Sequence, residues 1–144
     1  MFPRSLLAAL LCAALAAPAL AASYKPGDRQ FAFIQGHDPV GFERAVKTGA
    51  DLIKAGDAKQ FRVYLIGRAV LMAIPGVPTV VQKGIIKTLR TTPGLKLVAC
   101  KETVDAIVKL AHQRPPLLPN TIVETCKDQR QKLESQGWQL AIGF

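Results

Sequence analysis

Short apolar runs recur along the chain, and three of them are followed directly by a glycine. Five of these runs are rich in aromatic and branched side chains, which is typical of buried strands. They cover residues 30–35, 61–66, 95–99, 121–123 and 138–142. The sequence therefore predicts five strands.

Between the strands, apolar residues recur at intervals of three and four, which predicts helices. Asp38 followed by Pro39 predicts the start of the first helix, and Gly56 its end. Apolar stripes within residues 81–89 and 104–111 predict two more helices, and residues 127–136 a polar one. Strands and helices thus alternate.

This alternation predicts a three-layer α/β/α domain with a five-stranded, mainly parallel sheet of the flavodoxin-like or Rossmann-like kind. In such folds, ligands collect at the edge formed by the carboxyl ends of the strands, here called the carboxyl edge. The residues expected there are Gly36, His37, Asp38, Gly67, Arg68, Cys100, Lys101, Glu124, Thr125 and Cys126.

The apolar run of residues 69–74 follows the second strand and is too short to span a membrane. Two interpretations remain open: it packs into the core, or it forms a subunit interface or hydrophobic lip near Cys100.

The N-terminus has the pattern of an export signal. Arg4 supplies a positive charge, an uncharged apolar stretch follows, and Ala19-Leu20-Ala21 resembles a cleavage site. We therefore expect a signal peptide over residues 1–21 and a single domain over residues 22–144. The sequence predicts a periplasmic protein with no membrane span.

The net charge is +9, from 19 basic and 10 acidic residues. Removing the predicted signal peptide takes away Arg4 and leaves +8. The basic residues do not form blocks and no aromatic residues interleave with them, so solvated helix faces are favoured over a nucleic-acid surface. We predict no nucleic-acid partner.

Several common motifs are absent from the sequence: the dinucleotide G-x-G-x-x-G, the P-loop, C-x-x-C, H-E-x-x-H and G-x-S-x-G. The loop after the first strand also lacks the hydroxyl groups that would cradle the phosphate of a flavin. We predict no cofactor and no metal, which leaves cysteine chemistry.

Cys100 lies where the third strand meets the next helix. At a helix N-terminus, free N–H groups and the helix dipole favour a thiolate, and Lys101 would add to this field while Glu102 would oppose it. A half-buried cysteine acting as a small hydrophobe would occupy the same position. Both roles remain open.

Cys126 follows the fourth strand, so the two sulfurs could meet at the carboxyl edge. In an oxidising compartment two cysteines can form a disulfide. The bridge would be either structural or a resolving partner for Cys100, and the sequence leaves these alternatives open.

His37 and Arg68 are expected on the same edge, as a base or an anion-binding pair, although a loop histidine is more often a surface residue. His112 ends the third helix, roughly 18 Å from its start, and cannot act on Cys100. Asp38 is interpreted as a helix cap.

At this point the chain resembles the DsrE/DsrF-like family, which includes sulfur-relay subunits. The resemblance lies in Phe61-Arg62-Val63-Tyr64-Leu65-Ile66-Gly67-Arg68-Ala69-Val70, in Gly94-Leu95-Lys96-Leu97-Val98-Ala99-Cys100 and in Gln136-Gly137-Trp138. In relay members a cysteine after the third strand carries sulfur as a persulfide, and Cys100 matches that position. The resemblance also implies a homo-oligomer. Two features depart from it: the export signal and the additional Cys126.

The primary hypothesis is an exported sulfur carrier that uses Cys100 as its catalytic residue, with Lys101, His37, Arg68 and Cys126 in support. Its partner would be a sulfur donor or acceptor protein, or a small anionic sulfur compound. Such a protein would be a carrier more than a turnover enzyme. The alternatives are a non-catalytic binding or assembly module with a Cys100–Cys126 disulfide, and a thiol–disulfide oxidoreductase.

Overall fold

The computed structural model describes residues 24–76 and 80–144. The predicted signal peptide and its cleavage site lie outside the described residues. None of the helices in these two ranges is long and apolar enough to cross a membrane.

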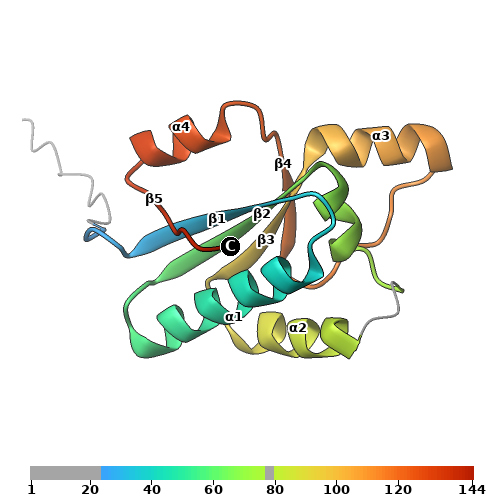
Figure 1. Ribbon diagram of the computed structural model, residues 1–144. Helices are drawn as coiled ribbons and strands as arrows, with labels where there is room; N and C mark the ends of the chain where they lie inside the picture. Colours follow the sequence, from blue (N-terminus) through green and yellow to red (C-terminus); the bar gives the residue numbers. More distant parts are fainter. Residues whose placement is uncertain (1–23, 77–79) are drawn as a thin grey trace, which may run out of the picture.

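Five parallel strands form one sheet in the order β4-β3-β2-β1-β5 (Figure 1). They are β1 (Arg29–Gln35), β2 (Gln60–Ile66), β3 (Leu95–Cys100), β4 (Thr121–Glu124) and β5 (Gln139–Leu140). The predicted three-layer α/β class is confirmed, and the sheet is parallel throughout.

The last strand is shorter than the predicted 138–142. The backbone N–H of Trp138 donates to the carbonyl of Leu133, so this residue belongs to the turn that ends the preceding helix. Only Gln139 and Leu140 pair with β1, and the N–H of Ala141 adds one bond to Phe31.

Four α-helices and one 3₁₀ helix connect the strands. They are α1 (Pro39–Ala55), η1 (Gly67–Ala73), α2 (Val80–Thr91), α3 (Lys101–Ala111) and α4 (Gln129–Ser135). The predicted caps of α1 are confirmed, because the Asp38 side chain accepts a hydrogen bond from the N–H of Gly41 and Gly56 adopts a left-handed conformation.

The two faces of the sheet are covered unequally. Helices α1 and α2 lie on one face and α4 on the other (Figure 1). The first face carries a large core that also includes Val104 of α3 and Val70 of η1. The second face carries a small core, made of Phe31, Tyr64, Val98, Leu133 and Trp138. Because α4 has only seven residues, the second face has room for polar groups beside this core.

The apolar run of residues 69–74 packs into the large core, as one of its two interpretations predicts. Ala69, Val70 and Ala73 are fully buried and Met72 nearly so, whereas Leu71 is 38% exposed. The run therefore forms most of η1 as a buried connection, and it presents one large apolar side chain to solvent.

Two glycines are required by close packing. A Cβ at Gly49 of α1 would lie 2.5 Å from Cδ1 of Phe61 on β2, so the missing side chain lets helix and sheet approach. Gly94, just before β3, has a φ of +92°, and a Cβ there would lie 2.5 Å from the carbonyl oxygen of Lys59. A side chain at either position would force a shift in the sheet that carries the cysteines.

Candidate functional site

A disulfide joins Cys100 and Cys126 at the carboxyl edge. Cys100 is the last residue of β3, and the strand register places it opposite Glu124, the last residue of β4. Cys126 follows two residues later, which brings the two Cα atoms to 5.3 Å, within the usual range for a disulfide. The disulfide that the sequence predicted only as one alternative is therefore formed.

The two sulfurs differ in accessibility. Cys100 is 2% exposed and packs in the large core. Cys126 is half-buried and lies on a connection between exposed residues, Thr125 and Lys127. Cys126 is therefore the less deeply buried residue of the pair, although its side chain packs against both cores.

Cys100 also directly precedes α3. It adopts an extended conformation at the N-cap position and makes no side-chain capping bond. The helix dipole and the free N–H groups of the first turn favour negative charge at this position. If the bridge opens, the helix N-terminus favours a thiolate on Cys100, whereas the burial of this residue in the large core opposes it.

Glu102 ties the two connections together beside the bridge. The backbone N–H of Cys126 donates to Oε2 of Glu102 at 3.2 Å. Backbone N–H groups of Glu102 itself, Cys126 and Lys127 hold the pKa of this carboxyl below its ordinary value. The sequence predicted only that Glu102 would oppose a thiolate. In the structure its carboxylate also accepts a backbone hydrogen bond from the connection after β4.

The other predicted supporting residues lie on the carboxyl edge, and none of the hydrogen bonds and ion pairs found among the described residues joins them to the bridge. Lys101 pairs with Asp105 one turn along α3. Arg68 is exposed at the start of η1, after β2, and His37 is exposed after β1. Since β2 lies between β1 and β3, the strand that precedes His37 is two strand spacings from the strand that ends at Cys100, roughly 10 Å.

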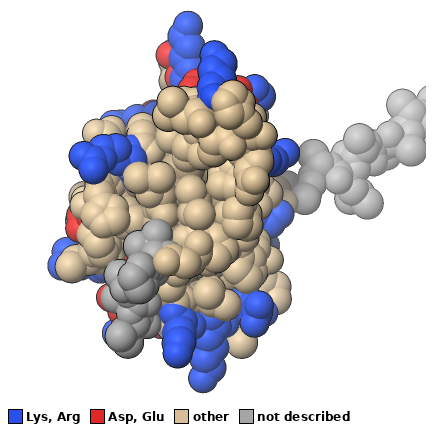
Figure 2. Space-filling model, turned by 90° about the vertical axis from the view of Figure 1, so that its right-hand side faces the viewer, with Lys and Arg blue, Asp and Glu red and all other residues tan. Residues whose placement is uncertain are grey.

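The carboxyl edge itself carries little charge at its centre. Figure 2 looks onto this side of the molecule and shows mostly uncharged side chains in the middle, with Lys and Arg around the margin. The attraction of an anion by Arg68 and His37 stays a prediction.

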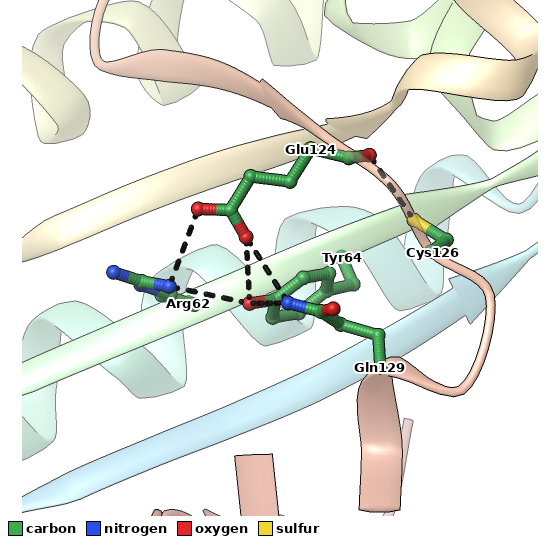
Figure 3. A network of polar contacts seen from close by, with 5 residues as sticks. All are labelled: Arg62, Tyr64, Glu124, Cys126 and Gln129. Carbon is green, nitrogen blue, oxygen red and sulfur yellow. Dashed lines mark hydrogen bonds and ion pairs between the residues drawn. The ribbon is translucent and has the colours of Figure 1, made fainter. Parts of the chain in front are cut away.

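A polar cluster lies on the α4 face of the sheet, next to the connection that carries Cys126 (Figure 3). Glu124 is at its centre: Arg62 Nη1 lies 3.6 Å from its Oε1, while the hydroxyl of Tyr64 and Nε2 of Gln129 donate to its Oε2 at 3.4 and 3.1 Å. Gln129 is only 6% exposed. Two hydrogen bonds and one ion pair thus hold the carboxylate of Glu124 in place.

A groove of about 460 Å³ opens beside this cluster and is here called the basic groove. It contains three cationic side chains, Arg62, Lys127 and Lys132, against one carboxylate. Its lining residues are Arg62, Glu124, Thr125, Lys127, Gln129, Lys132 and Gln136. Thr125 and Lys127 flank Cys126 in the sequence, so the groove is bordered by both chain neighbours of this cysteine, although Cys126 itself does not line it.

The chain matches no protein-family model, and no curated protein matches it. Among solved structures it is similar to the YchN protein from E. coli, with a TM-score of 0.55 and 16% sequence identity over 79% of this chain and 99% of that one. YchN is a DsrE-like fold protein. The chain has a DsrE-like fold. This likeness concerns the fold alone.

Among the described residues, one group of side chains could hold a metal ion. Ligand atoms of Cys100, Glu102 and Cys126 all lie within 4.8 Å of one another. A metal would need both sulfurs as thiolates. In the bridged form the two sulfurs are bonded to each other and Glu102 accepts backbone hydrogen bonds, so this group binds a metal only after reduction.

Sequence reasoning missed the polar cluster of this DsrE-like fold. The available signal was a charged residue, Arg62, inside an otherwise apolar strand of a parallel sheet. Its spacing of two from Tyr64 places both side chains on one face of β2. The contribution of Glu124 and Gln129 could not be read from the sequence, because it depends on the register of β4 and on where α4 crosses the sheet.

Proposed function

We propose that the protein is an exported carrier of sulfane sulfur that works through the Cys100–Cys126 pair. The observation that carries the proposal is the bridge itself, with one sulfur at the N-terminus of α3 and the other half-exposed on the edge. Two further features support it: the resemblance to sulfur-relay proteins at Cys100, and the export signal pattern. A disulfide is also typical of an oxidising compartment such as the periplasm.

The bridge can take up sulfur without a separate oxidant or reductant. A persulfide anion, R–S–S⁻, attacks the sulfur of Cys126 and forms a trisulfide with it. The Cys100–Cys126 bond breaks, and its electron pair leaves on Cys100 as a thiolate. The Cys100 thiolate then attacks the central sulfur of R–S–S–S–Cys126 and expels R–S⁻.

The product is Cys100–S–S–S–Cys126, so the net reaction transfers one neutral sulfur atom from the persulfide to the bridge. An acceptor thiolate, R′–S⁻, reverses these steps and leaves as R′–S–S⁻. The exposure of Cys126 suits it to the first attack. The helix terminus at Cys100 suits that sulfur to leave and return as a thiolate.

The experiment is intact-mass measurement of the oxidised mature protein, without reductant, after incubation with glutathione persulfide. We expect a gain of one sulfur atom per chain and its loss on addition of excess thiol. The control is the double variant Cys100→Ser with Cys126→Ser. No added sulfur on the wild type, or the same addition on the double variant, would sink the proposal.

A second candidate is a non-catalytic binding or assembly module that uses the bridge as a structural link. The burial of Cys100 in the large core favours it. Counting the free thiols of the native protein under mild reductant separates the two. A structural bridge stays closed until the protein unfolds, whereas a carrier bridge opens in the folded state.

A further inference from the structure

We infer that the basic groove binds the oxyanion group of a small sulfur compound, a sulfonate, thiosulfonate or carboxylate, and holds its sulfur beside Cys126. The inference rests on the proposed sulfur-carrier function and names the class of its substrate. Three observations carry it: the charge of the groove, the fixed position of Arg62 and the place of the groove along the chain.

The groove keeps a positive charge because its one carboxylate is already satisfied. Glu124 faces Arg62, Tyr64 and Gln129, which together supply one ion pair and two hydrogen bonds. Lys127 and Lys132 take part in none of the ion pairs found among the described residues. Two cationic side chains therefore stand beside a neutralised pair, and an anion that enters the groove meets a net attraction.

Arg62 is held in one position by an aromatic ring and the polar cluster. Its Cζ lies 4.6 Å from the centre of the Trp138 ring, and Nη1 contacts both Tyr64 and Glu124. The guanidinium carries further N–H donors at Nε and Nη2. Such a planar group in a fixed position suits the paired oxygens of a carboxylate or sulfonate.

The groove has the size and the place of a substrate site. Its volume of about 460 Å³ falls in the range of small-molecule pockets. Thr125 and Lys127 line it from either side of Cys126. A second cavity of about 320 Å³ shares Arg62 and extends the basic surface to Lys96. A ligand whose anion lies at Arg62 would therefore occupy a groove bordered by the two chain neighbours of Cys126.

The experiment compares two thiols that differ only in charge, 2-mercaptoethanesulfonate and 2-mercaptoethanol, as reductants of the folded, oxidised protein. Rates are corrected for the thiolate fraction of each compound. We expect the sulfonate to react at least about fivefold faster at low salt, and its advantage to fall as salt is added. The double variant Lys127→Gln with Lys132→Gln should lose most of this preference.

The matched controls test charge and binding separately. Lys109→Gln removes a charge from the exposed last turn of α3, away from the groove, and should keep the preference. Propanesulfonate, which has no thiol, should slow the reaction of the anionic thiol and change the fluorescence of Trp138, the one tryptophan of the chain.

Equal corrected rates for the two thiols would overturn the inference. So would a loss of preference as large in the Lys109 variant as in the groove variant, since that result would reflect net charge alone. If only the sulfur-carrier function is wrong, the result is different. The preference for the anionic thiol and the effect of propanesulfonate persist, but the persulfide adds no sulfur to the protein.

Discussion

Reduction of the Cys100–Cys126 bridge should lower the free energy of unfolding by about 3.5 kcal/mol. The half-cystines are separated by 26 positions, and the loop-closure relation for a loop of that length gives this value at room temperature. The loss is a large part of the total stability of a small domain, which is commonly about 5–15 kcal/mol.

The assay is guanidinium unfolding of the mature protein with and without reductant, followed by the fluorescence of Trp138. This residue is 5% exposed in the small core, so its signal reports the loss of packing under α4. Comparing the oxidised and reduced wild type keeps the sequence constant. The difference therefore measures the bridge without the additional cost of replacing the buried sulfur of Cys100.

The double variant Cys100→Ala with Cys126→Ala is the control, and its stability should not respond to reductant. A difference below about 1 kcal/mol between the oxidised and reduced wild type would refute the reasoning. It would mean that closing the loop does not restrict the unfolded chain as the separation of the cysteines requires.

Three further outcomes follow from particular contacts. Gly49→Ala should lower the free energy of unfolding by about 1–3 kcal/mol in denaturant titrations, because its Cβ would press on the ring of Phe61. Gly84→Ala, where a Cβ meets open space in α2, should instead raise it by about 0.5–1 kcal/mol, and a loss of stability there would contradict this reasoning. The folded-state pKa of Glu102 is lowered, so its stabilising effect is present above the unfolded-state pKa and is lost as pH falls. The stability advantage of wild type over Glu102→Gln should therefore shrink as the pH falls through and below the unfolded-state pKa of about 4.3, and an advantage that is constant with pH would show that the carboxylate does not hold the Cys126 connection.

Local signals predicted most of the fold. Strand positions follow from runs of apolar residues, since both faces of a parallel sheet are covered and the whole run is buried. The ends of α1 follow from Asp38 and Gly56, whose conformations depend on neighbouring residues alone. The final strand was predicted too long, because the backbone of Trp138 pairs with the end of α4 and that pairing is invisible in the run of apolar residues.

The candidate site was only partly predictable. The sequence placed Cys100 at a strand-to-helix junction and Cys126 beyond the next strand, and both positions agree with the structure. It also grouped His37 and Arg68 with them, because carboxyl ends of parallel strands share an edge. In the structure, β2 lies between the strand before His37 and the strand that ends at Cys100. The order of elements along the chain does not determine how far apart two residues lie on the carboxyl edge.

The sequence by itself determined which segments are strands and helices and that a thiol stands at the start of α3, since apolar periodicity and turn residues act over a few positions. Only the tertiary structure decided that this thiol is bridged, because the register of β3 and β4 sets the distance between the cysteines. It also decided that positive charge gathers in the basic groove on the α4 face, where Arg62 of β2 meets Lys127 and Lys132. Arg62 is far from the two lysines along the chain, and packing of the sheet against α4 brings them together.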